Sequence, residues 1–160
     1  MSVIKNGLPV SDPWVHLDDE VIPDGRSPFT VTLARWLGHK AELVTHGQPV
    51  GVRLAAADAP EALASDLDTL PLIVLDMHLF TDGRAFSQAR LLRDRLDFTG
   101  EIRARGDFLR DQMYFLQRVG VDAFEFPEGS DLDDRLKAFS EFTVTYQAAA
   151  DTAEPLYRRR

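Results

Sequence analysis

The strongest constraint on the fold is a strand pattern that alternates with a helix pattern along the middle of the chain. The run Leu72–Leu75 is continuously apolar, which is typical of a strand buried on both faces of a sheet. Strands separated by helices favour a mostly parallel sheet with helical crossovers. The patterns predict strands at residues 14–17, 50–54, 72–75, 101–105 and 122–126, and helices at 30–44, 58–70, 83–96, 107–119 and 130–143.

About four strand–helix units follow one another, and they fit two α/β architectures. A closed barrel of parallel strands needs eight units, so we expect an open, mostly parallel sheet with the three-layer arrangement of flavodoxin. The alternative is a half-barrel that dimerisation completes, so a homodimer stays open. We divide the chain into an N-terminal arm or hairpin at residues 1–29, one α/β domain at 30–148 and a frayed tail at 149–160.

Charge and composition argue against several classes of function. The 160 residues carry a formal net charge of −8, so we expect no general affinity for nucleic acid or for an anionic membrane. There is no apolar run of membrane-spanning length and no pattern of a signal peptide, so we expect a cytoplasmic protein. The sequence has no cysteine, and its four histidines have no metal-ligand spacing, so we expect no protein-held metal; the cofactor stays unknown.

An arginine-rich segment between residues 84 and 118 stands out against this acidic background. It contains eight arginines and five acidic residues, a local balance of +3, so the rest of the chain carries −11. Part of this charge fits surface pairs on the helix at 83–96, where Arg90–Asp94 and Arg93–Asp97 have the spacing i, i+4. The segment is either a cleft for an anion or partner, or a solvated face.

The carboxyl ends of the strands are the expected place for a ligand in an open parallel sheet. The loop after the strand at 72–75 has Thr81 or Asp82 to cap the next helix and Gly83 to let the backbone turn closely. Amide groups at a helix start attract anions, and Arg84 and Arg105 offer bidentate contacts. A small oxyanion is therefore the expected guest, the alternative being that Asp82 only caps the helix while Arg84 pairs with a carboxylate.

Other catalytic patterns are incomplete or missing. The strand that ends at Asp76 resembles the phosphoacceptor strand of response-regulator receiver domains, but the acidic pair and the late lysine of that family are absent. His78 is the one histidine in the central loops; it is either a solvated loop residue, which we favour, or a general base. No dinucleotide fingerprint, P-loop or nucleophile elbow occurs in the sequence.

Six short segments together resemble an uncharacterised bacterial family, a domain of unknown function whose members are described as oxidoreductases involved in sulfite reduction. The resemblance covers roughly Thr30 to Phe126. The segments that carry it are Phe80–Arg84, Ala89–Arg93, Gly100–Ala104, Gly106-Asp107, Arg110–Gln112 and Gly120–Phe124.

The resemblance implies a role in assimilatory sulfur metabolism, because members of that family are encoded beside sulfite reductase and phosphoadenylyl-sulfate reductase. These two enzymes are the implied partners. The family offers no established catalytic residues to transfer, so the chain is either an oxidoreductase component of sulfite reduction or, as we favour on mechanism, a non-catalytic accessory. A small-anion or phosphate-binding sensor outside sulfur metabolism is the alternative function.

Sulfite and sulfate are small oxyanions, so the implied pathway and the predicted anion site agree. The helix predicted at 107–119 adds a polar strip to the same end of the sheet. We therefore expect one functional surface for a small oxyanion or a partner, formed by Asp76, Thr81, Asp82, Gly83, Arg84, Arg103, Arg105, Asp107, Arg110, Asp111 and Gln112.

Overall fold

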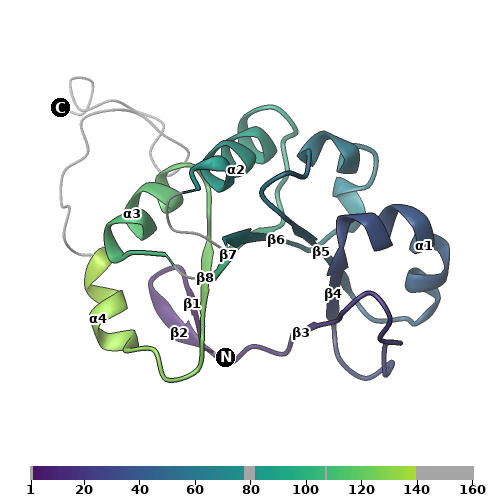
Figure 1. The fold of residues 1–160 in the computed structure, drawn as a ribbon, viewed down its shortest axis with the longest axis horizontal. Helices are drawn as coiled ribbons and strands as arrows, with labels where there is room; N and C mark the ends of the chain where they lie inside the picture. The colour runs from purple at the N-terminus through teal and green to yellow at the C-terminus, as the bar shows by residue number, and fades with distance from the viewer. Residues whose placement is uncertain (1, 78–81, 107, 140–160) are drawn as a thin grey trace.

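The strands form one curled sheet in the computed structural model, which describes residues 2–77, 82–106 and 108–139 (Figure 1). Within these residues the sheet has eight strands in the order β2-β1-β8-β7-β6-β5-β4-β3. Strands β3 to β8 run parallel, whereas β1 is antiparallel to both β8 and β2. The bounds are β1 (Ser2–Lys5), β2 (Leu8–Val10), β3 (Val15–His16), β4 (Phe29–Thr32), β5 (Val50–Leu54), β6 (Leu72–Met77), β7 (Glu101–Gly106) and β8 (Ala123–Phe126).

The helices cover the convex side of this sheet (Figure 1). Neighbouring parallel strands are also consecutive in the chain, and right-handed crossovers between such strands place every helix on the same face. The helical elements are α1 (Leu33–Thr45), η1 (Pro60–Leu63), η2 (Leu67–Thr69), α2 (Arg84–Asp94), α3 (Arg110–Arg118), α4 (Leu132–Leu136) and η3 (Lys137–Phe139).

The expected flavodoxin-like arrangement is wrong, although the α/β class is correct. A three-layer sheet has helices on both faces because the strand order reverses at a switch point. Here the order of β3 to β8 follows the chain without reversal, and the sheet has more strands than four βα units supply. A curled sheet with its helices outside is the geometry of the half-barrel alternative, while its completion by dimerisation stays a prediction.

Alternating residues give the sheet an apolar outer face and an inner face where polar side chains lie beside a few apolar ones, such as Leu72 and Val74. On β5 and β6 the side chains of Val52, Leu54, Ile73 and Leu75 are fully buried in the core beneath the helices. Residues between them, such as Arg53, point to the inner side because successive side chains of a strand face opposite ways. The core therefore lies between the sheet and its outer helices.

Three of the predicted helices differ from the structure, and the one predicted at 130–143 is divided, as far as the described residues reach, into α4 and η3. Residues 29–32 form strand β4, and Thr32 caps α1 by accepting a hydrogen bond from the Arg35 amide at 3.2 Å. The β-branched pattern of this short segment favours a strand. Residues 58–70 form two short 3₁₀ helices, because the chain turns at Asp66, whose carboxylate accepts hydrogen bonds from Trp36 and Lys40 of α1.

The N-terminal residues belong to the same sheet. The hairpin of β1 and β2 extends it beyond β8, where Ile4 lies opposite Phe124. At the other edge β3 pairs with β4. The tail predicted at residues 149–160 lies outside the described residues, and within the described ones no helix has the length and apolarity of a membrane span.

Candidate functional site

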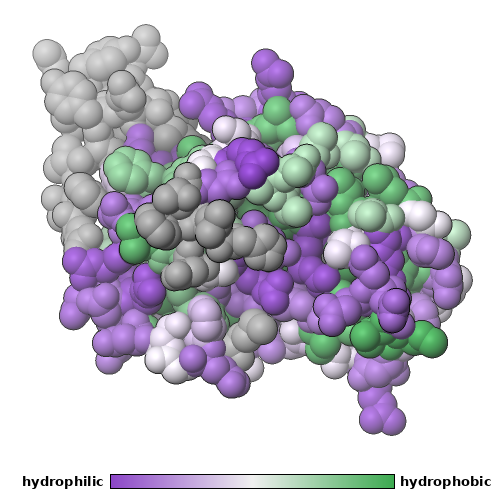
Figure 2. All heavy atoms as spheres, in the orientation of Figure 1, coloured by the Kyte–Doolittle hydropathy of each residue, from purple (hydrophilic) through white to green (hydrophobic). Residues whose placement is uncertain are grey.

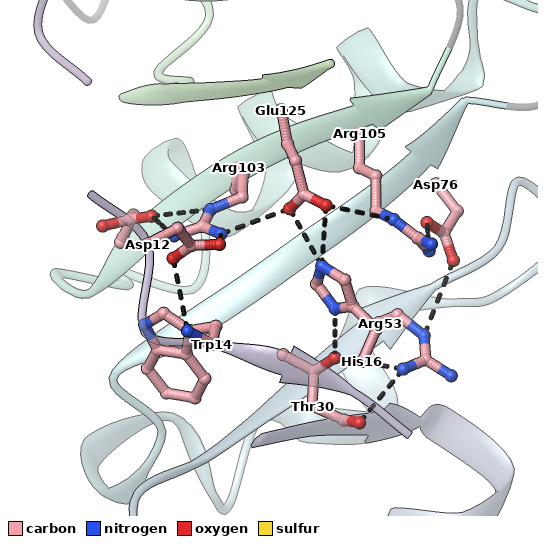
Figure 3. Close-up of polar contacts among 10 residues, drawn as sticks. Asp12, Trp14, His16, Thr30, Arg53, Asp76, Arg103, Arg105 and Glu125 are labelled. Atoms are coloured by element: carbon pink, nitrogen blue, oxygen red, sulfur yellow. Dashed lines mark hydrogen bonds and ion pairs between the residues drawn. The ribbon is translucent and has the colours of Figure 1, made fainter. Parts of the chain in front are cut away.

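Polar and charged side chains from all six parallel strands meet on the inner face of the sheet (Figure 3). Figure 2 shows hydrophilic residues inside the curve of the sheet in the orientation of Figure 1. We call this group the inner-face network, and it consists of Lys5, Asp12, His16, Thr30, Arg53, Asp76, Glu101, Arg103, Arg105 and Glu125.

His16 joins the two ends of the parallel part of the sheet. Its Nε2 lies 2.9 Å from both carboxylate oxygens of Glu125, and its Nδ1 lies 2.6 Å from the Thr30 hydroxyl. Because β3 and β8 are the first and last of the six parallel strands, this contact spans the opening of the curl. The N-terminal arm therefore closes the inner face.

Arg53, Asp76 and Arg105 complete a ring of contacts that begins and ends at Glu125 (Figure 3). Arg53 donates to the Thr30 hydroxyl at 3.0 Å, and its Nε lies 3.8 Å from Asp76 Oδ2. Arg105 donates from Nη1 to Asp76 Oδ1 at 3.1 Å, and its Nε lies 3.4 Å from Glu125 Oε1. Arg53 also donates to the backbone carbonyl of Leu17 at 2.7 Å. Side-chain contacts of the ring therefore join each of the six parallel strands to at least one other strand.

Arg103 contacts three carboxylates of the network. Its guanidinium contacts Asp12 at 2.8 Å, Glu101 at 2.8 Å and Glu125 at 3.2 Å, and only 3% of its side chain is exposed. Lys5 of β1 donates to the other oxygen of Glu101 at 2.6 Å. Paired charges of this kind avoid the large desolvation cost of an isolated buried ion.

The charges of the network balance. Lys5, Arg53, Arg103 and Arg105 face the four carboxylates of Asp12, Asp76, Glu101 and Glu125. The inner face is thus polar and self-neutralised.

The buried groups of the network have shifted pKa values. Burial acts to lower the pKa of Arg103, but hydrogen bonds and opposite charges from Asp12 and Glu101 outweigh it and raise the pKa. Burial acts to raise the pKa of Glu125, but His16 and Arg103 outweigh it and lower the pKa. Burial lowers the pKa of Arg53, although the Asp76 carboxylate opposes that shift.

The ring is most exposed at Asp76 and Arg105, near the carboxyl ends of β6 and β7. The two residues lie side by side in the sheet register, and 14% and 28% of their side chains are exposed. Within the described part of the chain, no hydrogen bond occupies Arg105 Nη2 or Asp76 Oδ2. At the expected ligand end of the sheet, the donor Arg105 Nη2 therefore lies near the acceptor Asp76 Oδ2, which has only the 3.8 Å ion pair with Arg53.

Asp82 and Arg84 form a separate pair at the start of α2. Asp82 accepts hydrogen bonds from the backbone amide of Arg84 at 3.1 Å and from its guanidinium at 2.6 Å. The Arg84 guanidinium lowers the pKa of Asp82 to about 2. Gly83 is the N-cap residue and provides no side-chain cap. The Asp82 carboxylate thus fills the place at this helix start where an external anion was expected.

The remaining predicted residues lie on or beside α3. Arg110 contacts Asp134 of α4 at 3.0 Å, Gln112 accepts a hydrogen bond from the Leu109 amide at 2.9 Å, and Asp111 accepts one from the Gln112 amide. These contacts begin α3 and hold it against α4. Thr81, Asp107 and His78 lie outside the described residues.

Of the predicted site, the structure brings together Asp76, Arg103 and Arg105. Sequence reasoning missed several of their partners, among them His16, Arg53 and Glu125. One signal was available: Arg53 and Glu125 each lie between two apolar residues of a predicted strand, which indicates a charged side chain on the face opposite the core.

The described residues contain no group of three or more His, Asp and Glu side chains arranged to hold a metal ion. One hollow, with a volume of about 190 Å³, lies between α1 and residues 19–23, where Arg35, His39 and His46 line it. None of its lining residues belongs to the inner-face network.

Comparison with known proteins gives a family but no function. No curated protein matches the chain. One family model matches residues 51–157, so the match begins later than the resemblance seen in the sequence and extends beyond it. Because this match covers more than half of the sequence, the chain belongs to DUF934, a family of bacterial proteins of unknown function.

Proposed function

We propose that the protein is an accessory of assimilatory sulfite reduction that binds a small oxyanion beside Arg105, at the carboxyl ends of β6 and β7. The observation that carries the proposal is the Arg105 guanidinium, which is partly exposed and has one donor nitrogen without a hydrogen bond among the described residues. Arginine is suited to oxyanions because its planar N–H groups match two oxygens at once.

The neighbouring residues support an anion at this position. Arg53 and Arg105 both face the carboxylate of Asp76, so two guanidinium groups lie beside the proposed anion. Glu125 lies on the far side of Arg105, where Arg103 and His16 also contact it. The sulfur assignment rests on the resemblance to the family of sulfite reduction, whose substrates are small oxyanions.

The accessory role has its own support. The sequence has no cysteine and no nucleotide-binding fingerprint, so a redox reaction would depend on a cofactor or on a partner. An acidic surface suits docking to a basic partner by electrostatic steering. The residues outside 84–118 carry a net charge of −11, whereas residues 84–118 carry +3. Sulfite reductase and phosphoadenylyl-sulfate reductase are the proposed partners.

Binding is tested by titrating the purified protein with sodium sulfite in a calorimeter. We expect Arg105→Gln to weaken binding by about tenfold or more, the loss of one charge-assisted contact. Arg90→Gln is the matched control, because Arg90 is an exposed arginine paired with Asp94 on α2. Equal affinities for the wild type and Arg105→Gln would disprove the site.

The pathway is tested by deleting the gene and growing the strain on sulfate, sulfite or cysteine. The proposal is supported if the deletion strain grows on cysteine but not on sulfate or sulfite. The wild-type gene and Arg90→Gln should then restore growth on sulfate and sulfite, whereas Arg105→Gln should not. Normal growth on all three sulfur sources would refute the role in sulfite reduction and favour an anion sensor. Visible absorbance of the purified protein separates the two roles, because an electron-transfer cofactor gives colour and an accessory does not.

A further inference from the structure

We infer that this site selects an oxyanion that still carries a proton, such as hydrogen sulfite or hydrogen phosphate, and discriminates against sulfate. The inference rests on the proposed function, since it concerns the same site. It follows from a free hydrogen-bond acceptor next to the free donor of Arg105.

The donor and the acceptor have fixed relative positions. Asp76 and Arg105 pair in register on neighbouring parallel strands and project from the same face of the sheet. Asp76 Oδ1 accepts the Arg105 Nη1 hydrogen bond at 3.1 Å, which orients both groups. Oδ2 makes only a 3.8 Å ion pair with Arg53 and accepts no hydrogen bond from the described residues. A ligand held by Arg105 Nη2 therefore meets the Asp76 carboxylate.

The carboxylate sets the chemical requirement. An ionised carboxylate is an acceptor only, so it cannot bond to an oxygen that also only accepts. Near neutral pH sulfate carries no proton, and each of its oxygens would face Asp76 as one negative group against another. Hydrogen sulfite and hydrogen phosphate each have a hydroxyl that donates to the carboxylate in a short, charge-assisted hydrogen bond.

The surrounding charges favour a carboxylate in this role. Arg53 of β5 and Arg105 of β7 face Asp76 from either side, and Glu125 of β8 faces Arg105. Asp18 and Asp19, which follow β3, also act on the charge of Arg53, and Glu125 contacts His16 and Arg103. Among the described residues, both guanidinium groups leave Asp76 Oδ2 without a hydrogen bond, so this oxygen can accept one from a ligand.

The test compares sulfite, phosphate and sulfate by calorimetry under nitrogen, with sodium chloride as the ionic-strength control. We expect sulfate to bind the wild type at least about tenfold more weakly than sulfite, the cost of an unmatched acceptor pair. Sulfite affinity is expected to fall as rising pH removes the proton, whereas sulfate affinity stays level. The chain has no cysteine, so sulfite has no disulfide to cleave.

Two variants identify Asp76 as the selecting group. Asp76→Asn provides an amide donor, so sulfate should gain affinity while hydrogen sulfite loses it. Asp76→Glu keeps a carboxylate acceptor and should still bind sulfite more tightly than sulfate. This variant controls for changes in packing. Circular dichroism checks that both are folded, and the pH series on the wild type decides the matter if Asp76→Asn does not fold.

The outcomes separate the two proposals. If the wild type binds all three anions equally and Arg105→Gln abolishes that binding, the oxyanion site stands and the selectivity is wrong. If sulfate binds more tightly than sulfite, the selectivity is likewise wrong. If none of the three binds, both proposals fail together.

Discussion

Glu125 lies at the centre of the inner face, where it contacts His16, Arg103 and Arg105 and is only 1% exposed. A buried carboxylate is costly to keep in a protein unless cations and hydrogen bonds replace its water. Its pKa is lowered because His16 and Arg103 outweigh the effect of burial. At the residue scale, Glu125 is therefore a group whose charge stabilises the folded state.

We expect Glu125→Gln to lower the free energy of unfolding by about 3 kcal/mol at pH 7, because removing one partner leaves buried cations uncompensated. Urea unfolding followed by circular dichroism measures the change. Asp94→Asn is the matched control: Asp94 pairs with Arg90 on the exposed side of α2, and its loss should cost no more than about 0.5 kcal/mol.

The pH dependence of the unfolding free energy of the wild type and of Glu125→Gln provides a second test of the Glu125 charge. A carboxyl whose folded pKa is lowered stabilises the fold above its ordinary value, which is 4.5 for Glu125. This stabilisation is lost as the pH falls through the folded pKa. The difference in unfolding free energy between the wild type and Glu125→Gln should therefore become smaller below pH 4.5. A difference that does not change with pH would contradict the assigned role of the Glu125 charge.

The candidate site was only partly predictable at this scale. Asp76 and Arg105 could be anticipated because they end predicted strands, where parallel sheets bind ligands. Glu125 and His16 could not, since they are 109 residues apart and meet only because the sheet curls. A strand pattern indicates which face a residue occupies, but the pattern does not specify which distant strand that face approaches.

At the scale of elements, the end of β7 depends on a glycine. Gly106 follows Arg105, has φ of +131° and lies against β6, so that an added Cβ would be 2.2 Å from the Met77 carbonyl oxygen. Both the backbone angle and the neighbouring backbone exclude a side chain there. The close approach keeps β6 and β7 paired as far as the residues of the candidate site.

Gly106→Ala is expected to destabilise the protein by at least about 1 kcal/mol, because strained backbone costs 1–3 kcal/mol and the carbonyl cannot withdraw freely. The same substitution at Gly38, within α1, meets no atom within 4 Å and should be neutral or stabilising, as alanine favours helices. Thermal unfolding of both variants measures the difference. Equal effects would show that β7 does not pass this close to β6.

The elements themselves were more predictable than their boundaries. Buried strands such as β6 have long apolar runs, so periodicity locates them well. The predicted ion pair between Arg90 and Asp94 also forms, with its nitrogen and oxygen 3.0 Å apart. Arg93 instead contacts Asp122 at 2.5 Å and the carbonyls of Phe98 and Gly100, because a neighbouring loop competes for its guanidinium. Such tertiary competition is invisible to a local spacing rule.

At the scale of the whole molecule, strand order decides the shape. Helix and strand patterns alone are compatible with both a doubly wound sheet and a curled one, because the same βαβ units build each. The consecutive order of β3 to β8 makes the sheet curl, and the arm then brings His16 to Glu125 across the opening. The interior charges are thus a consequence of closure, and they hold it in place.

This closure predicts energetic coupling between the first and last parallel strands. Residues in contact couple by about 0.5–3 kcal/mol in a double-mutant cycle, whereas distant ones add within about 0.5 kcal/mol. We expect His16→Gln and Glu125→Gln to be coupled by at least about 1 kcal/mol in urea unfolding. His16→Gln combined with Arg90→Gln should be additive, since Arg90 lies on the outer side of α2 and is paired with Asp94. Additivity in both cycles would mean that the two edges do not meet in solution, and the inner face would then be an open surface.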